Sequence, residues 1–429
     1  MKILVLYFKW KKYRDRNTID EHLFCFRRYV KDVQYHYFNA ANGIPWYITM
    51  VNYDAVILHY TFLAIRWRED LYKEWLKTVK SLKKVSGYIV AIPQDEYAET
   101  AALYEFFREY GIRTVFTCFS SNDYDTVYPN ERIKLDEKIT VFPGYIDEEA
   151  AKRLSSRYGE NNDRPIDLGY RARKLPYWLG RHGQFKYEIG NVFAKRMKAS
   201  GLKVDISTDE KDVFPGSSWY DFLGRCRAVL GCEGGASLFD PTGKIRMKVE
   251  AYIKNHPDAS FKEVEEYCFP GQDYNIRLFT LSPRHFECAI TKTCQILLEG
   301  YYGGIFSPGV HYIELKKDYS NIDQVLECLR DAGYCKQIAE NAYRDIIESK
   351  KYTYRIFANQ VIDHISKKVG KVGLGARREE QKKPHFDLLE KYLFLREFVE
   401  PILVKVFYVW LGFKLFKTAI IKRTLAKLK

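Results

Sequence analysis

Short apolar runs alternate with longer amphipathic segments along most of the chain, and this alternation constrains the fold more than any other feature. The apolar runs have the length of buried strands, and the segments between them repeat apolar residues at helical spacing. Strands and helices that alternate in this way form parallel βαβ units in an open, doubly wound sheet. In the first series the predicted strands are Lys2–Tyr7, Ala55–His59, Tyr88–Ile92, Thr114–Thr117 and Thr140–Phe142, and the predicted helices include Glu69–Leu82 and Glu99–Tyr110.

A polar, turn-rich stretch at Gly159–Asp163 separates this series from a second one. A chain of 429 residues also exceeds what one hydrophobic core usually serves. We therefore predict an α/β protein with two Rossmann-like domains, 1–157 and 158–368, that face a cleft. The second series has predicted strands at Ile166–Tyr170, Val204–Ile206, Ala228–Leu230, Gln295–Leu298 and Tyr312–Leu315, with helices at Tyr187–Ala199, Phe286–Thr291 and Ile322–Ala332.

The end of the chain has a different composition. Residues 369–385 resemble a flexible linker, and 386–429 are predicted to form a basic amphipathic helix. From Pro401 onward there are seven Lys and Arg residues and no Asp or Glu, which is half of the net charge of +14. The longest uncharged apolar run, Val406–Phe413, is too short to cross a bilayer, so this tail is predicted to lie on an anionic membrane surface. The alternative is a helix packed on the main body.

The cysteines and the N-terminus indicate the compartment. The nine cysteines form no CxxC pair and no zinc spacing with histidine, and an odd number spread along the chain is typical of reduced thiols. The apolar run at Met1–Tyr7 is too short for a signal sequence. We expect a cytoplasmic protein that is peripheral on the inner face of the cell membrane.

The segment from Ser282 to Tyr312 carries the most specific local pattern. Ser282 is a candidate helix N-cap, Pro283 fits the first helical position, and Glu287 follows in the same helix. Backbone amides at a helix start and the Arg284 guanidinium suit a phosphate. Glu287 is able to accept hydrogen bonds from ribose hydroxyls, with an ordinary surface acid as the alternative.

This segment resembles the donor-binding module of GT-B glycosyltransferases, particularly the bacterial family-1/family-4-like enzymes. The resemblance implies that 1–157 binds the acceptor, that 158–368 binds a nucleotide-sugar donor, and that Glu287 grips the ribose. Gly303 and Gly304 match the family's glycine loop. The family's paired glutamate is absent, since Phe279 stands eight positions before Glu287, and Glu299 is the candidate replacement.

Two further clusters are candidates for the donor site. Arg171 and Arg173 follow a predicted strand and share one face of an extended chain, where the resemblance implies contact with the donor diphosphate. Solvated residues on a linker are the alternative. The second cluster is a glycine loop that is also compatible with a plain turn, and its candidate donor contacts are Glu233, Gly234, Gly235 and Ser237.

In the first domain, three side chains at strand ends are candidates for catalysis. Asp95 and Glu96 follow one predicted strand, and His59 ends another. An inverting transferase needs an Asp, Glu or His near the acceptor hydroxyl, and Asp95 is the favoured base. A helix N-cap is the alternative for Asp95.

The sequence therefore predicts a metal-independent glycosyltransferase of bacterial surface polysaccharide or glycolipid biosynthesis. Its donor is a substrate, and no cofactor is expected. The expected partners are a nucleotide sugar, a glycan or lipid-linked acceptor, and the membrane, with no nucleic acid. A catalytically degenerate scaffold and a protein that binds anionic polymers or nucleic acid are the alternatives, the second because of the charge of +14.

Overall fold

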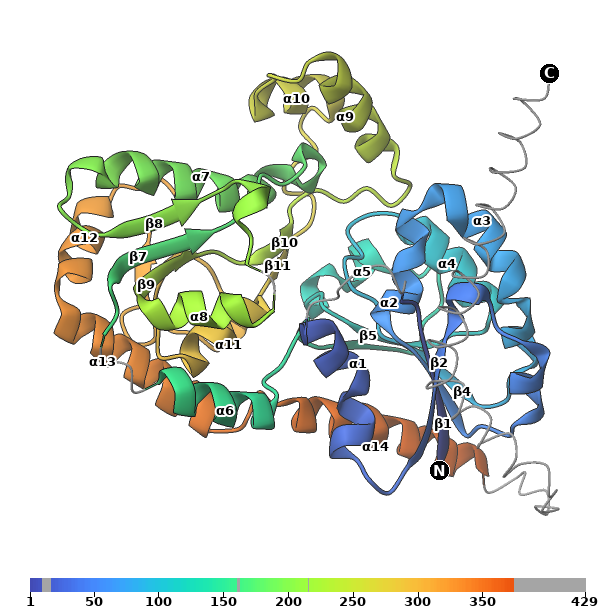
Figure 1. The fold of residues 1–429 in the computed structure, drawn as a ribbon. Coiled ribbons are helices and arrows are strands. Elements are labelled where there is room, and N and C mark those ends of the chain that lie inside the picture. Colours follow the sequence, from blue (N-terminus) through green and yellow to red (C-terminus); the bar gives the residue numbers. More distant parts are fainter. Residues whose placement is uncertain (10–16, 160–162, 215, 374–429) are drawn as a thin grey trace, which may run out of the picture. The chain divides into compact units, whose positions relative to one another are not determined.

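Six parallel strands form the first sheet of the computed structural model, which describes residues 1–9, 17–159, 163–214 and 216–373 (Figure 1). The strand order is β2-β1-β3-β4-β5-β6, and β1 pairs in parallel with β3, with Ile3 opposite Ala55. The strands are β1 (Lys2–Tyr7), β2 (Gln34–Asn39), β3 (Ala55–Leu58), β4 (Tyr88–Ala91), β5 (Thr114–Thr117) and β6 (Glu137–Thr140). The helices between them are α1 (Asn17–Tyr29), α2 (Tyr60–Leu63), α3 (Glu69–Thr78), α4 (Thr100–Glu109) and α5 (Tyr124–Val127).

Five parallel strands form the second sheet, in the order β13-β12-β9-β7-β8. A short antiparallel pair, β10 and β11, follows β9. The strands are β7 (Ile166–Arg171), β8 (Val204–Ser207), β9 (Cys226–Gly231), β10 (Gly234–Ala236), β11 (Leu278–Thr280), β12 (Cys294–Leu298) and β13 (Ile313–Leu315). The helices are α6 (Glu148–Tyr158), α7 (Gly180–Arg196), α8 (Ser217–Arg225), α9 (Lys244–Asn255), α10 (Phe261–Cys268), α11 (Pro283–Ile290), α12 (Ile322–Arg330), α13 (Ala332–Ala342) and α14 (Tyr354–Gly373).

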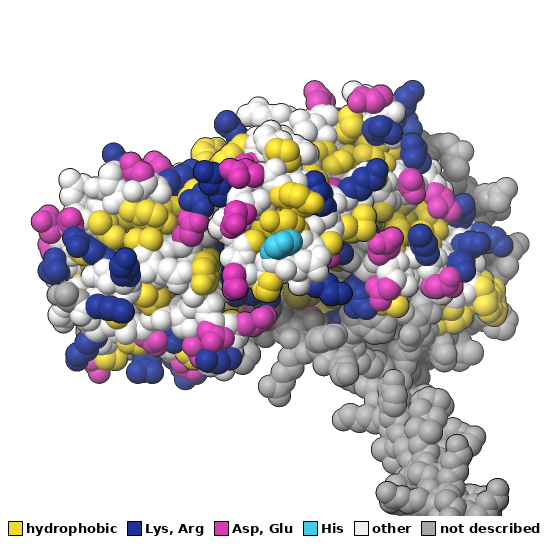
Figure 2. Space-filling view, turned by 90° about the horizontal axis from the view of Figure 1, so that it is seen from above, with side chains coloured by type: hydrophobic (Ala, Val, Ile, Leu, Met, Phe, Trp, Pro, Cys, Tyr) yellow, Lys and Arg dark blue, Asp and Glu magenta, His cyan; other side chains and the backbone are white. Residues whose placement is uncertain are grey.

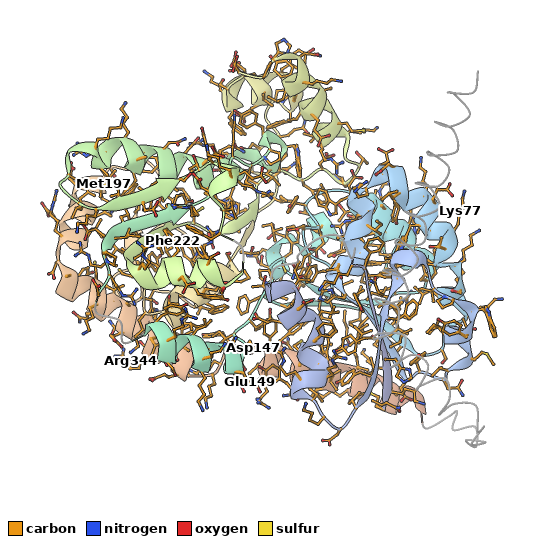
Figure 3. All side chains as sticks on the ribbon, viewed as in Figure 1. Lys77, Asp147, Glu149, Met197, Phe222 and Arg344 are labelled. Carbon is orange, nitrogen blue, oxygen red and sulfur yellow. The ribbon has the colours of Figure 1, made fainter. Side chains whose placement is uncertain are left out.

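Helices cover both faces of the second sheet, as Figure 1 shows. On one face α7, α12 and α13 bury apolar residues such as Phe193 and Leu329 against the strands. On the other face α6, α8 and α11 do so with Leu154, Phe222 and Phe286. Figure 3 labels Phe222 in this layer. The two parallel sheets with helices on their faces confirm the predicted α/β fold of two Rossmann-like halves.

The last described helix, α14, packs in a different domain from the one that the sequence predicts. The sequence assigns residues up to 368 to the second domain, yet α14 places Phe357 and Val361 in the core of the first sheet, beside Val5 and Phe26. Helix α6 packs with the second sheet, and Asp147, its N-cap, pairs with Arg28 of α1 (Figure 3). The chain therefore passes between the two cores twice, and Met1–Val369 form one compact unit.

The C-terminal predictions are only partly within the described residues. The predicted linker begins at 369, whereas α14 continues to Gly373. The predicted amphipathic helix, 386–429, lies outside the described residues. Among the residues that are described, no helix is long and apolar enough to span a membrane. All nine cysteines are free thiols, and all but Cys328 are buried.

Candidate functional site

The second sheet changes its direction of winding between β7 and β9. From β7 the chain moves to one side to form β8, then returns across β7 to form β9, β12 and β13 on the other side. At such a switch point the connecting segments diverge, and ligands of open α/β sheets bind outside the carboxyl ends of the two strands. Those ends are Arg171 and Gly231, so they define where a ligand of this sheet is expected.

Two cations lie at this switch point, Lys186 on α7 and Arg284 on α11. Burial raises the pKa of the Cys232 thiol, directly after β9, to about 11, and both cations act on it in the opposite direction. The Lys186 Nζ is 3.8 Å from where a Cβ on Gly234 would lie. Arg284 donates through Nη1 to the carbonyl oxygen of Arg171 at 2.7 Å. Its guanidinium also lies 4.5 Å from the ring centre of Trp219, so two contacts fix this cation.

Two buried histidines line the same region without adding positive charge. The pKa of His182 and of His285 is lowered to about 3, mainly by burial, and Lys186 contributes to the lowering in both. His182 Nε2 lies 3.2 Å from the carbonyl oxygen of Gly234, so this nitrogen carries the proton and donates. The His182 ring stacks on Phe279 with ring centres 3.9 Å apart. The Phe279 ring is therefore part of the packing around His182.

The start of α7 is already occupied by a protein carboxylate. Asp273 accepts from the backbone N–H of Arg181 at 2.9 Å, and Ser237 Oγ accepts from that of His182 at 3.1 Å. Ser237 in turn donates to Asp273 at 2.7 Å and is fully buried. The predicted role of Ser237 at a phosphate or sugar does not fit this position, because its hydroxyl caps the helix.

The two glycines of the predicted loop instead lie in a strand with different surroundings. Gly234 and Gly235 belong to β10, which pairs with β11. A Cβ on Gly234 would make ordinary van der Waals contacts with Thr280 and the Lys186 ammonium, at 3.7 to 3.8 Å, so a small side chain would fit here beside the cation. Gly235 has a φ of 107° and a Cβ there would overlap the carbonyl oxygen of Leu278, so this glycine serves the pairing of β10 with β11.

Helix α11 begins as predicted, with Ser282 as its N-cap and Pro283 in its first turn. The Ser282 side chain accepts from the N–H of Arg284, and His285 Nδ1 lies 3.0 Å from the N–H of Ser282. One turn later, Glu287 accepts from Trp219 Nε1 at 2.7 Å and from the Tyr220 hydroxyl at 3.5 Å. These contacts hold its half-buried carboxylate in one orientation, on the same helix as Arg284.

A second carboxyl group, Glu21 on α1, lies near Glu287. Burial raises the pKa of Glu21 to about 7, with further increases from Asp147 and Glu287, while Arg28 and Arg153 lower it. Two acidic groups with different environments therefore approach each other from different halves of the chain. The sequence prediction did not include Glu21.

The two arginines at the end of β7 are used within the protein. Arg171 is 7% exposed and donates to the Asp205 carboxylate at 2.6 Å and to the Asp212 carbonyl oxygen at 3.1 Å. Arg173 is exposed and forms an ion pair with Glu210 at 3.1 Å. The predicted contact of Arg171 with a diphosphate is not supported, because its guanidinium is buried among protein acceptors. Its backbone carbonyl contributes instead by holding Arg284.

Four other predicted donor residues lie in or near a neighbouring loop. Glu233 is 4% exposed and accepts from the N–H of Tyr302 at 2.7 Å. Glu299 accepts from the N–H of Lys317 at 3.1 Å, and it makes no hydrogen bond to the glycine loop among the described residues. Gly303 and Gly304 have positive φ values of 65° and 69°, as a tight turn requires. The expected replacement of the missing glutamate by Glu299 remains a prediction.

The three candidates from the first sheet have different environments. Asp95 is exposed, yet its pKa is raised, first by desolvation, while Arg66 and Lys186 act to lower it. Because Lys186 acts on the Asp95 carboxyl group, the two side chains lie within electrostatic range of each other. Burial likewise raises the pKa of Glu96, whose carboxylate accepts from Thr117 and Tyr128 and is 0% exposed.

His59 is a structural residue of the first core. It is 0% exposed, caps α2 through Nδ1, and has its Nε2 2.9 Å from Nδ1 of His22. Burial lowers its pKa well below the usual value, and His22 lowers it further. A role for His59 as a base near an acceptor is not supported, because neither ring nitrogen is accessible.

Lys186 is the main candidate for ligand binding that the sequence analysis did not include. It lies four residues after His182, and this spacing places both side chains on one face of a helix. That spacing is the sequence pattern from which Lys186 could have been found. No cluster of three or more His, Cys, Asp or Glu side chains able to hold a metal ion occurs within the part of the chain that the structure describes.

No protein-family model matches this chain, and no curated protein matches it in sequence. Solved structures are similar over most of its length. Anabaena HepE in complex with UDP and glucose is 10% identical, with a TM-score of 0.46 over 86% of this chain and 100% of that one. An alpha-glucosyltransferase in complex with UDP and a 13-mer DNA containing an HMU base is 12% identical, with a TM-score of 0.49 over 85% and 99%. AviGT4, a glycosyltransferase involved in avilamycin A biosynthesis, is 10% identical, with a TM-score of 0.39 over 86% and 98%. Similarities of this size assign no ligand to this chain.

Proposed function

We propose that this protein is a glycosyltransferase that uses a nucleoside diphosphate sugar as donor. One observation carries the proposal: Lys186 and Arg284 approach the switch point of the second sheet from two helices, Lys186 beside Gly234 and Arg284 at the end of β7. A diphosphate fits this place, because its charge matches the two cations and each cation offers several N–H donors.

The donor is proposed to lie across α11. Lys186 and Arg284 hold the diphosphate, and Glu287, fixed by Trp219 and Tyr220, accepts hydrogen bonds from the ribose hydroxyls. When the glycosidic bond to the diphosphate breaks, negative charge develops on the leaving oxygen. The two side-chain cations stabilise that charge, so we expect activity to persist in excess EDTA.

Asp95 is the proposed general base for the acceptor hydroxyl. Lys186 acts electrostatically on its carboxyl group, which supports a position on the acceptor side of the donor phosphates, and its raised pKa strengthens it as a base. In its ionised form it would accept the hydroxyl proton as the acceptor oxygen attacks the anomeric carbon. Glu96 and His59 are buried and hold no part in this proposal.

For the acceptor we propose a glycan or a lipid-linked glycan of bacterial surface polysaccharide or glycolipid synthesis, reached at the inner face of the cell membrane. The seven cations of the C-terminal segment support membrane contact. On the face drawn in Figure 2, cationic and acidic side chains are intermixed rather than segregated. One similar structure holds DNA, so duplex DNA belongs among the acceptors to be tested.

The test is a transfer assay with the full chain and a panel of UDP-, GDP-, ADP-, TDP- and CMP-sugars. Acceptor arms contain bacterial membrane extract, soluble oligosaccharides or duplex DNA, each with and without EDTA. We expect release of the nucleotide and glycosylation of a membrane or saccharide acceptor, unchanged by EDTA. The absence of both transfer and nucleotide release with every donor would reject the proposal.

A further inference from the structure

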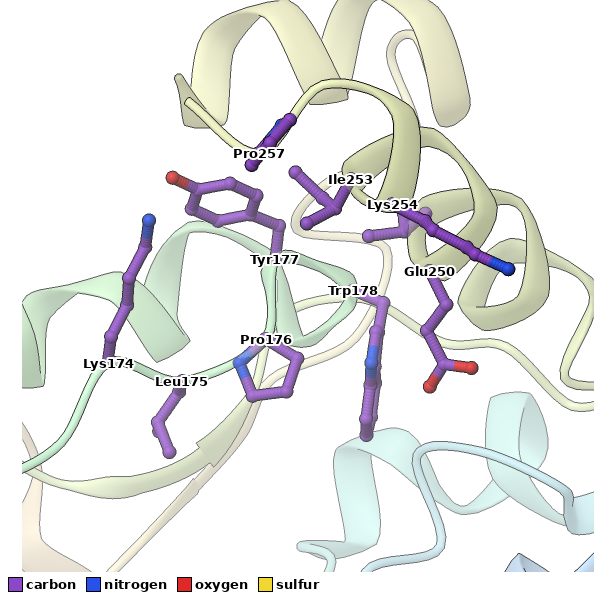
Figure 4. A pocket seen from close by; sticks show the side chains of 10 residues that line it. Lys174, Leu175, Pro176, Tyr177, Trp178, Glu250, Ile253, Lys254 and Pro257 are labelled. Carbon is purple, nitrogen blue, oxygen red and sulfur yellow. The ribbon is translucent and has the colours of Figure 1, made fainter. Parts of the chain in front are cut away.

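An open cavity of about 490 Å³ lies in the second half of the chain, apart from the two cations (Figure 4). One wall is the segment that joins β7 to α7, and the other is α9 with the turn after it. Its lining residues are Lys174, Leu175, Pro176, Tyr177, Trp178, Val249, Glu250, Ile253, Lys254 and Pro257.

The cavity has an apolar floor and a charged rim. Val249 is buried, and Tyr177, Trp178 and Ile253 are half-buried, so ring faces and aliphatic carbon form the floor. The Tyr177 hydroxyl donates to the carbonyl oxygen of Ala259 at 3.1 Å, which fixes the ring. A rigid apolar floor of this kind binds a flat, partly apolar surface.

The rim side chains are exposed and of both signs. Figure 4 shows Lys174 on one side of the cavity, with Glu250 and Lys254 on the other. Glu250 is an acceptor, and the two lysines are donors. A sugar ring has the complementary surface, since its C–H face is apolar and hydroxyls that donate and accept surround its edge. A lipid chain matches the floor but offers the rim no hydrogen-bonding groups, whereas Glu250, which also pairs with Arg246 at 3.2 Å, keeps a second carboxylate oxygen to accept from a hydroxyl.

The cavity connects to the proposed catalytic region through Trp178. The Trp178 ring contacts Trp67 and Tyr97 of the first half, with ring centres 5.8 and 6.3 Å apart. Tyr97 in turn lies close enough to Asp95 to lower the pKa of its carboxyl group. Aromatic surface therefore runs from the proposed base to the cavity, which suits an elongated ligand.

We infer that this cavity is a distal subsite for the saccharide chain of the acceptor. The inference rests on the proposed function, because the subsite serves an acceptor whose reacting hydroxyl lies at Asp95. Units of the acceptor away from that hydroxyl would stack on Tyr177 and Trp178 and hydrogen-bond to Glu250 and Lys254.

The test uses a matched pair of double variants of the full chain. Glu250→Gln with Lys254→Met removes two charges from the rim. Glu266→Gln with Lys262→Met makes the same changes on α10, where the two exposed side chains pair with each other at 3.8 Å outside the cavity. Each protein is applied to a printed oligosaccharide array, to liposomes with anionic lipid and to duplex DNA, and its binding of UDP, GDP and ADP is titrated separately.

We expect the native chain and the α10 variant to retain the same oligosaccharides, and the rim variant to lose about tenfold or more in retention. Nucleotide binding should be equal in all three. No retained oligosaccharide, equal retention by the rim variant, or loss of lipid or DNA binding in its place would overturn the subsite. If the native chain bound none of the three nucleotides, that result would count against the proposed function, whatever the array shows.

Discussion

At the scale of single residues, the candidate site depends on two cations, Lys186 and Arg284, near the strand ends of the second sheet. Arg171 is surrounded by carboxylate and carbonyl oxygens, whereas Arg284 gives one N–H to a carbonyl and stacks on Trp219. A guanidinium has five N–H donors, so this contact leaves Arg284 able to bind a phosphate. This difference separates a structural arginine from a ligand-binding one.

Replacing either cation should weaken nucleotide binding. We expect Lys186→Met or Arg284→Met to reduce affinity for a nucleoside diphosphate roughly 10- to 100-fold, because each removes charge-assisted hydrogen bonds. Arg173→Met is the matched control, since Arg173 pairs with Glu210 at the surface. Calorimetric titration measures the three affinities, and a loss in the control as large as in the other two would contradict the assignment.

The proposed general base, Asp95, is tested against its neighbour Glu96, which serves as the control. Asp95→Asn should lower the transfer rate about 10²- to 10⁴-fold and leave nucleotide affinity unchanged. Asparagine also tolerates the left-handed backbone at this position, where φ is 57°. Because the pKa of Asp95 is raised, the native rate should rise with pH through a pKa above the ordinary aspartate value.

Glu96→Gln, the same isosteric change on a buried side chain, should leave both the rate and its pH profile as in the native chain. An Asp95→Asn variant with an unaltered rate would exclude this base.

At the scale of elements, the pairing of β10 with β11 fixes the position of the backbone beside Lys186. Gly235→Ala should destabilise the fold by at least about 1–3 kcal/mol, because alanine at a φ of 107° is strained and its Cβ overlaps Leu278. Gly234→Ala meets no such obstacle, so its stability should stay within about 0.5 kcal/mol of native. Its methyl group lies beside the Lys186 ammonium, so nucleotide affinity should fall.

Urea unfolding and nucleotide titration of both variants separate these effects. A Gly235→Ala protein as stable as the native chain would contradict the predicted backbone strain. Unchanged nucleotide affinity in Gly234→Ala would show that the nucleotide does not bind next to this position.

The contact between α1 and α2 contains a buried, uncharged histidine pair, His22 and His59. Burial lowers the pKa of His22 to about 3, whereas in the unfolded chain its pKa is near 6.5. Between these two pH values His22 is therefore protonated in the unfolded chain and neutral in the folded chain. The contribution of His22 to stability is complete above about pH 6.5 and is lost as the pH falls towards 3, at up to about 1.4 kcal/mol per pH unit.

His22→Asn removes this dependence. The stability difference between the native chain and the variant should therefore shrink as the pH is lowered from about 7 to about 5, measured by urea unfolding. Glu21, with its pKa near 7, titrates in both proteins and cancels in the difference. A difference that does not vary with pH would contradict the buried neutral state.

At the scale of the whole molecule, the alternating pattern predicts most strands because buried parallel strands are continuous apolar runs. Lys2–Tyr7 and Thr114–Thr117 match β1 and β5 residue for residue. Strand β2 is missed because it lies at the sheet edge and mixes aromatic with polar residues, without an aliphatic run. Helix α14 is assigned to the wrong core because helical spacing does not show which sheet a helix covers.

The site is less predictable than the fold, for a physical reason. Arg171 and Arg284 are the same residue type near strand ends, and only the three-dimensional structure shows which guanidinium is already satisfied. Lys186 resembles a solvated lysine of an amphipathic helix until α7 is placed at the switch point. The start of α11 is the part of the site for which the local pattern is sufficient, since the Ser282 N-cap and Pro283 follow directly from sequence, while the role of Glu287 stays a prediction.

The central claim is that the second half binds a nucleoside diphosphate through Lys186 and Arg284. Its most direct test is calorimetric titration of UDP, GDP, ADP, TDP and CMP into the full chain and into a Lys186→Met, Arg284→Met double variant that unfolds at the native urea concentration. Binding of at least one diphosphate by the native chain, and none by the double variant, is the predicted result. Equal affinity in the two proteins, or no binding of any nucleotide by the native chain, would contradict the claim.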